Sequence, residues 1–242
     1  MATNKRSNDI TITVIVNDET KHKMLKRVHG LSLYIEAYGL ILVFDTGPSS
    51  DILQYNSEKL NIDLSLIDAA IISHTHSDHI GGLPYIGWLA PSSSVYLPYD
   101  PGSSVIGYIK KQGLRPCEVL DWLSITSRIY VTKPFYGPPW EQSLVIRSNK
   151  GLLVITGCSH PGINNIVEEV MNYFNDEVHG VIGGLHLANA PDNVIVQTID
   201  KLMEKVNMLV PLHCSGRRAI DYVVKKYNDK VVIAGAGDLI EI

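Results

Sequence analysis

The segment from Ser73 to Gly82 reads Ser-His-Thr-His-Ser-Asp-His-Ile-Gly-Gly and holds four side chains that can bind a metal within six positions, namely His74, His76, Asp78 and His79. Two imidazoles one residue apart can reach one ion, and a carboxylate with a third imidazole can reach a second. In two-metal sites the ions lie about 3.5–4 Å apart. The spacing therefore predicts a binuclear centre. Imidazole and carboxylate ligands around an open position favour zinc, with manganese or iron as alternatives, over magnesium.

Further ligands are expected where later apolar runs end. Four side chains follow such runs directly: Cys158 and His160 after 152–155, His186 after 181–184, and His213 after 209–212. If these runs are neighbouring parallel strands, their carboxyl ends deliver all four to one edge of a sheet. His160 and His213 are predicted ligands, whereas His186 either binds a metal, supports a ligand or contacts substrate. His22, His29 and His179 lack this placement and are expected to be ordinary residues.

The elements that must position these residues alternate between strands and helices. Residues 10–16, 31–36, 40–44 and 69–72 form strand-like runs, with a helical pattern at 51–60. The second half repeats this logic, with a hairpin (143–147 and 152–155), strands at 178–182 and 208–211, and helices at 163–174, 194–206 and 217–226. The segment 92–142 shows only a helix at 104–112 and a Pro-rich loop at 133–140. Two sheets packed face to face with outer helices are predicted: a four-layer αββα sandwich of the α/β (α+β) class, formed as one domain over 1–242.

Composition excludes several classes of protein. The 242 residues are 45% hydrophobic and 19% charged, which is typical of a globular chain with a large core. A net charge of −4 leaves no basic field for nucleic acid. The apolar runs fall far short of the roughly 18 residues needed to cross a bilayer. No apolar signal follows the polar start at 1–9, and three widely spaced cysteines do not form a disulfide framework, so a cytoplasmic location is expected. Exposed sheet edges leave homo-oligomerisation open.

These motifs resemble the metallo-β-lactamase superfamily. The resemblance rests on the run Phe44-Asp45-Thr46-Gly47 and on His74-x-His76-x-Asp78-His79, and it implies a metallo-β-lactamase-like fold over nearly the whole chain. The stretches 30–36, 156–162, 183–187 and 211–216 are similar to a narrower branch labelled 7,8-dihydropterin-6-methyl-4-(β-D-ribofuranosyl)aminobenzene 5'-phosphate synthase. That label implies formation of a carbon–nitrogen bond between a pterin methylene and an arylamine.

The chain departs from the superfamily pattern at two ligands. Where most members carry a histidine before the later hairpin and a bridging aspartate after it, this sequence has Glu141 and Cys158. Cys158 is either a bridging thiolate or a small buried residue, while His160 supplies the missing imidazole. The candidate catalytic residues are Asp78, which would orient a metal-activated water, His186, and Asp45. Asp45 either braces a histidine or forms a turn.

Two features bear on the substrate. Arg217 and Arg218 begin a helix beside His213, where they either attract a phosphate or carboxylate or are solvated surface residues. Tyr136 and Trp140 either stack a flat substrate or are ordinary aromatics. Three hypotheses follow: a hydrolase of a small, anionic substrate acting through a metal-bound hydroxide, a transferase joining a dihydropterin to a ribosylated arylamine phosphate, and a metal-bound ligand-binding or signalling module with little turnover.

Overall fold

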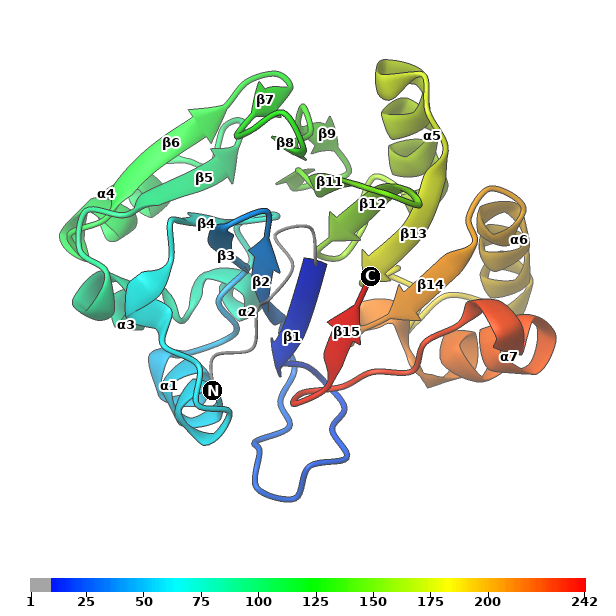
Figure 1. The fold of residues 1–242 in the computed structure, drawn as a ribbon, viewed down its shortest axis with the longest axis horizontal. Coiled ribbons are helices and arrows are strands. Elements are labelled where there is room, and N and C mark those ends of the chain that lie inside the picture. The colour runs from blue at the N-terminus through cyan, green and yellow to red at the C-terminus, as the bar shows by residue number, and fades with distance from the viewer. Residues whose placement is uncertain (1–9) are drawn as a thin grey trace.

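The computed structural model describes residues 10–242, so the polar start at 1–9 lies outside the described residues. Its strands form two large sheets and one small ribbon (Figure 1). The first sheet has the order β15-β1-β2-β3-β4-β5-β6, with β1 (Ile10–Val16), β2 (Ser32–Ala37), β3 (Leu40–Phe44), β4 (Ala69–Ile71), β5 (Ser94–Pro98), β6 (Arg115–Val119) and β15 (Leu239–Glu241). The second has the order β14-β13-β12-β11-β8-β7, with β7 (Leu123–Ser124), β8 (Ile129–Val131), β11 (Leu144–Ser148), β12 (Gly151–Thr156), β13 (Val178–Gly183) and β14 (Met208–Pro211). The ribbon pairs β9 (Phe135–Tyr136) with β10 (Trp140–Glu141).

The helices cover the outer faces of the two sheets. Near the first sheet lie α1 (Ser50–Lys59), α2 (Ser77–Ile80), α3 (Leu83–Leu89) and α4 (Ser103–Lys111), and over the second lie α5 (Ile163–Phe174), α6 (Asp192–Met203) and α7 (Arg217–Tyr227) (Figure 1). Short 3₁₀ turns occur at η1 (Leu64–Leu66), η2 (His213–Ser215) and η3 (Asn228–Lys230). Among the described residues, no helix is both long and apolar enough to cross a membrane.

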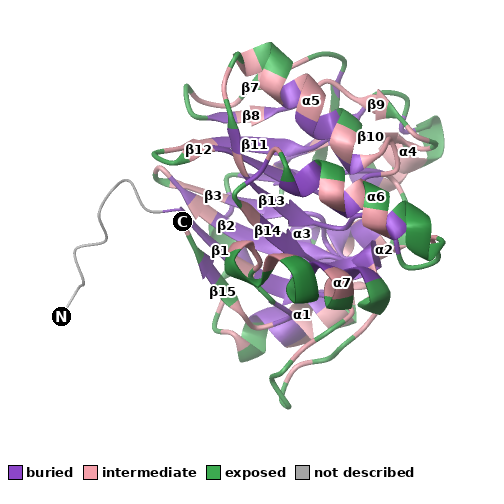
Figure 2. Ribbon diagram, turned by 90° about the vertical axis from the view of Figure 1, so that its right-hand side faces the viewer, coloured by how far each residue is buried: buried purple, intermediate pink, exposed green. Residues whose placement is uncertain are grey.

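Three apolar layers hold this arrangement together. One lies between the sheets and includes Phe44 and Ile182, both fully buried. A second joins the first sheet to α1, α3 and α4, and a third joins the second sheet to α5, α6 and α7. Because successive side chains of a strand point to opposite faces, Ile182 enters the central layer while its neighbour Val181 packs under the helices. Figure 2 shows the strands as the buried interior. The predicted αββα sandwich is confirmed.

The strands that carry the candidate ligands end at the same level. β12, β13 and β14 are parallel neighbours, with Thr156 opposite Gly183 and Gly183 opposite Pro211. Their carboxyl ends therefore share one edge, as the sequence predicts. β4 approaches this edge from the other sheet. The Gln142 backbone N–H donates to the Ser73 carbonyl at 2.9 Å, and its buried amide donates to the Ile72 carbonyl at 2.8 Å, so the two sheets are tied together next to the ligands.

The structure differs from the sequence-based prediction mainly in the segment 92–142. β5 and β6 extend the first sheet in parallel with β4, although the sequence shows no clear strand there. β6 is the edge strand, with only Val119 buried and with Pro116 in its course, so it lacks the apolar alternation that marks a strand. Helix α6 begins at Asp192, two residues earlier than predicted, directly after the extended Pro191.

Candidate metal centre

Four strand ends bring their side chains together at one rim of the sandwich. β4 leads into His74, His76, Asp78 and His79, β12 into Cys158 and His160, β13 into His186, and β14 into His213 and Cys214. Their rings form a continuous cluster, with centroid separations of 4.1 Å for His74–His79, 4.6 Å for His74–His160, 5.0 Å for His79–His213 and 4.5 Å for His160–His186. A cavity of about 240 Å³ opens onto this cluster. Residues as far apart in the sequence as His76 and His213 thus face one small volume.

Within the cluster, two groups of donors are adjacent. The first consists of His74, His76 and His160, whose ligand atoms all lie within 4.8 Å of one another. The second centres on Asp78, whose Oδ2 lies 3.4 Å from His79 Nε2 and 3.3 Å from His213 Nε2. Two neighbouring donor sets are the arrangement that two metal ions need.

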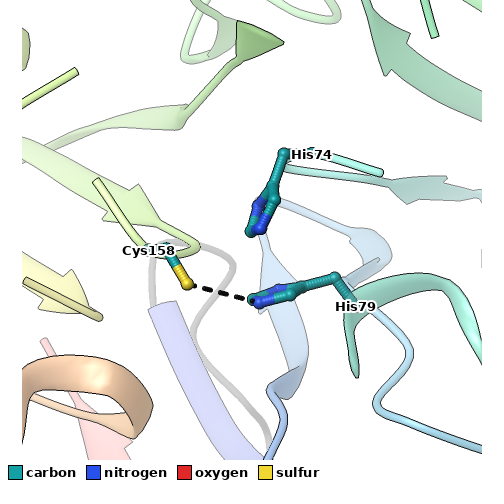
Figure 3. Close-up of side chains that lie close together, drawn as sticks. All are labelled: His74, His79 and Cys158. Carbon is teal, nitrogen blue, oxygen red and sulfur yellow. Dashed lines mark hydrogen bonds between the residues drawn. The ribbon is translucent and has the colours of Figure 1, made fainter. Parts of the chain in front are cut away.

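Cys158 lies between these two sets. Its Sγ is 3.4 Å from His79 Nε2 and within 4.8 Å of a His74 nitrogen, and Figure 3 shows the three side chains pointing toward one another. The same sulfur also lies within 4.8 Å of donor atoms of His160 and His213. Of the two alternatives left open for Cys158, this position supports that of a bridging ligand.

The imidazoles are oriented from behind by fixed acceptors. Nδ1 of His79 contacts Asp45 Oδ2 at 2.6 Å, Nδ1 of His160 contacts Glu141 Oε2 at 2.8 Å, Nδ1 of His213 contacts Asp18 Oδ1 at 2.7 Å, and Nδ1 of His74 contacts Ser73 Oγ at 2.9 Å. A carboxylate can only accept, so in the neutral forms of His79, His160 and His213 it assigns the proton to Nδ1 and leaves the Nε2 lone pair for a metal ion. Imidazoles that bind metals are held in this way.

This donor set fits a metal ion. Nε2 of His213 is buried and has no hydrogen-bond partner, although Asp78 Oδ2 lies 3.3 Å from it. A buried nitrogen without a partner is costly unless something else satisfies it. Nitrogen, carboxylate and thiol donors together are those that zinc accepts, and manganese and iron accept most of them.

Asp45 lies beneath the cluster and is fully buried. Its carboxylate accepts from the Ser73 N–H and hydroxyl, both at 2.7 Å, as well as from His79. Burial alone would lower the pKa of His79, but the Asp45 carboxylate raises it to about 10. Of the two roles left open for Asp45, the structure therefore gives it the bracing of a histidine, and it also occupies a left-handed backbone conformation with φ 56°.

Glu141 is the structural counterpart of Asp45 on the β12 side, and the sequence did not single it out for this role. It is fully buried, and its two oxygens accept from the backbone N–H groups of Cys158, Ser159 and His160 at 2.9, 2.8 and 2.8 Å. Burial raises the pKa of Glu141, but the hydrogen bond from the His160 ring and the nearby His74 lower it to about 2. Glu141 thereby shapes the whole loop that presents Cys158 and His160.

Asp18 and His29 are also part of the centre, although His29 was expected to be an ordinary residue. Asp18 accepts from His213 Nδ1 and from His29 Nδ1 at 2.8 Å, while His29 Nε2 lies 3.4 Å from Asp78 Oδ2. Both residues lie in the loop between β1 and β2, which shows no periodic pattern. The only sign in the sequence that this loop could support a metal site is that it contains an aspartate and a histidine.

His186 and Cys214 lie at the edge of the cluster. His186 is exposed, has φ 54°, and its backbone N–H donates to Cys214 Sγ at 3.3 Å. Cys214 and Cys158 interact, which raises the pKa of Cys158 and lowers that of Cys214. Because His186 lines the cavity at the cluster, it can contact a ligand or a substrate there.

The predicted substrate-binding residues are distributed unevenly. Arg217 is exposed, pairs with Asp221 at 2.9 Å and lines a second cavity next to the cluster. Arg218 does not reach the cluster, because it pairs with Asp192 at 2.6 Å and donates to the Ala190 carbonyl. The rings of Tyr136 and Trp140 lie 5.0 Å apart in the β9–β10 ribbon. The turn of this ribbon is packed against the His160–Pro161 backbone, where a Cβ on Gly137 would lie 2.3 Å from the Pro161 nitrogen.

Comparison with known proteins agrees with the fold and the motifs. Residues 25–87 match the family model of the metallo-beta-lactamase superfamily. The crystal structure of Tm1679, described as a metal-dependent hydrolase of the beta-lactamase superfamily, superimposes with a TM-score of 0.81 at 28% identity and covers 96% of this chain and 99% of that one.

Two curated proteins of Methanocaldococcus jannaschii match over most of their length. The 7,8-dihydropterin-6-methyl-4-(beta-D-ribofuranosyl)-aminobenzene-5'-phosphate synthase is 28% identical over 263 residues, covering 88% of this chain and 90% of that protein. The uncharacterized protein MJ0448 is 29% identical over 238 residues, covering 85% of this chain and 91% of that protein. The αββα fold, the family match over residues 25–87 and these similarities together make the chain similar to the metallo-β-lactamase superfamily.

Proposed function

We propose that this chain is a metal-dependent hydrolase of a small, anionic substrate, with zinc as the metal and manganese or iron as alternatives. The observation that carries the proposal is the set of imidazoles whose Nδ1 atoms are held by Asp45, Glu141, Asp18 and Ser73, which leaves their Nε2 atoms for a common cluster of donors. Imidazoles that bind metals are usually pre-oriented in this way. Two adjacent donor sets joined by Cys158 favour two ions over one.

The chain's own residues divide the work of hydrolysis. Bound metal would supply a Lewis acid and lower the pKa of water toward about 7. Asp78 lies between His79 and His213, with its carboxylate partly accessible from the cavity, so it can accept a hydrogen bond from the attacking water and orient it. His186 lines the same cavity from the β13 side, where it can donate a proton to the leaving group.

The shape and charge of the cavity support a small anionic substrate. At about 240 Å³ it admits only the reacting end of a molecule. The imidazoles of His29, His76 and His186 border it. An ester, lactone, thioester or phosphodiester has a group of this size that develops negative charge during hydrolysis.

The test is a hydrolysis screen of protein loaded with zinc, manganese or iron against phosphodiesters, lactones and thioesters. We expect metal-dependent turnover that is lost in His160→Ala, together with a fall in metal content per chain. His179→Ala is the matched control, because His179 lies half-buried in β13 away from the cluster. Full activity in His76→Ala or His160→Ala would contradict the proposal.

A second candidate is favoured by one of the relatives. Similarity over 88% of this chain to a dihydropterin-ribofuranosylaminobenzene phosphate synthase supports a transferase that joins a dihydropterin to an arylamine phosphate at the same centre. The aromatic pair Tyr136 and Trp140 stands beside the His160 loop, where it could stack a pterin. Incubation with both substrates, followed by mass detection of the adduct, separates the two candidates. An adduct without hydrolysis of any member of the panel would favour the transferase.

A further inference from the structure

A larger cavity adjoins the candidate metal centre. It has a volume of about 410 Å³ and lies between the loop at 17–21, the end of β14 and the start of α7. His29, His213 and Cys214 line both this cavity and the smaller one at the cluster. The two cavities are therefore neighbours divided by residues of the centre itself.

The inner wall of the larger cavity is apolar. It is formed by Pro211, Leu212, Ile220, Ile233 and Ala234. A volume of about 300–1,000 Å³ lined mainly by apolar groups is usual for small-molecule sites. Ile233 is 41% exposed although it is a large aliphatic residue, so the wall is not closed off by other parts of the described chain.

The charged residues around this wall are not balanced. Two acidic residues line it, but Asp18 is held by His213 and His29, and Glu19 pairs with Arg27 at 3.2 Å. Lys21 has no ion pair among residues 10–242. Arg217 pairs with Asp221 only through its Nε, and an exposed ion pair of this kind contributes little to stability. Two cations are thus available to a ligand.

We propose that this cavity binds the body of the substrate, a compact aromatic or alicyclic group bearing a phosphate or carboxylate that pairs with Lys21 and Arg217. The reacting end of the same molecule then extends past His213 to the metal centre. This inference rests on the proposed function for the location of the chemistry, and it adds the substrate class: an amphiphilic anion whose charge lies at the end remote from the bond that breaks.

The test is calorimetric titration of the metal-loaded protein with three probes: phenyl phosphate, benzoate and inorganic phosphate. Phenyl phosphate and benzoate both carry an anionic group on a phenyl ring, but the group is a phosphate in one and a carboxylate in the other. Their relative affinities therefore show which anion the cavity prefers. The double variant Lys21→Ala/Arg217→Ala is expected to weaken the binding of the preferred aryl anion about tenfold or more, as expected for lost charge-assisted hydrogen bonds.

The matched control is Lys23→Ala/Lys225→Ala, which removes the same charge from the same loop and helix at exposed residues outside the cavity. It should leave binding within about twofold of wild type, since long-range charge effects are screened. A second variant, Ile233→Trp, fills the apolar wall from an exposed position. It should weaken the aryl anion and leave inorganic phosphate unchanged.

Equal affinities in the double variant and its control, or no binding of either aryl anion to the wild type, would overturn the inference. An unchanged aryl affinity in Ile233→Trp would do the same. These outcomes are separate from those of the hydrolysis screen. If the protein hydrolyses a substrate with metal but the cavity variants bind the aryl anions as the wild type does, only the role of the cavity is refuted. If the cavity variants weaken binding as expected but no substrate is hydrolysed, only the proposed function is refuted.

Discussion

Replacing Glu141 by glutamine probes how the protein prepares His160. The carboxylate is fully buried, and both oxygens are engaged by N–H donors. Glutamine has nearly the same shape, but one oxygen becomes an NH₂ group. If the remaining oxygen still accepts from the backbone N–H groups of Cys158 and Ser159, the new NH₂ group faces the backbone N–H and the ring Nδ1 of His160. Both of these groups donate, so neither can bond to the NH₂ group.

The magnitude follows from this mismatch. The backbone N–H and the ring Nδ1 of His160 both lose their bond to Glu141 Oε2, which together costs about 3 kcal/mol. For a protein of this size, about 1 kcal/mol moves Tm by about 2–4 °C, so a fall of about 6–12 °C is expected. The His160 ring can avoid the clash only by moving its proton to Nε2, which removes the lone pair that faces the cluster. Metal affinity should therefore fall about 10- to 100-fold.

Both quantities can be measured on the same preparations. Thermal unfolding of the metal-free protein gives the stability change, and competition with a chelator gives the metal affinity. Glu118→Gln serves as the control, because Glu118 is exposed on the edge strand β6 and should change stability by less than about 0.5 kcal/mol. Wild-type metal affinity in Glu141→Gln would refute the idea that Glu141 sets the tautomer of His160.

Three further predictions test other parts of the centre. Asp45→Asn keeps a residue type that tolerates the observed φ of 56° but removes the charge that holds His79, so chelator competition should show metal affinity lowered about 10- to 100-fold at an unchanged fold by circular dichroism. Gly157→Ala places a Cβ 2.1 Å from Ser73 Oγ, so it should lower the free energy of unfolding by about 1–3 kcal/mol. Its control is Gly107→Ala in α4, whose Cβ meets no atom within 4 Å and which should raise the free energy of unfolding by about 0.5–1 kcal/mol. Denaturant melts measure both changes. Zinc at a free concentration of about 100 times its Kd should stabilise the protein by about 2.7 kcal/mol and raise Tm by about 5–11 °C, and no such rise would contradict metal binding.

Much of the fold could be predicted because its strands are buried and carry simple patterns. Residues 10–16, 40–44 and 208–211 form strands with the predicted bounds, and α5 occupies the predicted 163–174. These segments pack on a core, so their apolar spacing is dictated by burial. β6 could not be foreseen in this way, because it is an edge strand whose partner lies on one side only.

The candidate site could be predicted only where ligands follow strands. The sequence indicates His160 and His213 by their place after apolar runs, and the structure brings both to the cluster. Asp18, His29 and Glu141 gave no such signal, because two of them lie in an irregular loop and the third ends a two-residue strand. Their roles arise from contacts across the chain, such as Asp18 to His213 over 195 positions, and these become visible only once the sheets are assembled.

The backbone at this rim points to the same function as the side chains. Asp45, Ser159, His186 and His213 all have positive φ, between 46° and 63°, and each lies at the carboxyl end of a strand. Glycine would relieve this strain of about 1 kcal/mol or more per residue, but it has no side chain to offer the centre. Strained positions of this kind persist only where the surrounding structure over-determines them, and here hydrogen bonds hold Asp45, Ser159, His186 and His213. His186 and His213 line the cavity, whereas Asp45 holds His79 and Ser159 belongs to the loop held by Glu141, so these sharp turns place candidate ligands and their supports at one rim.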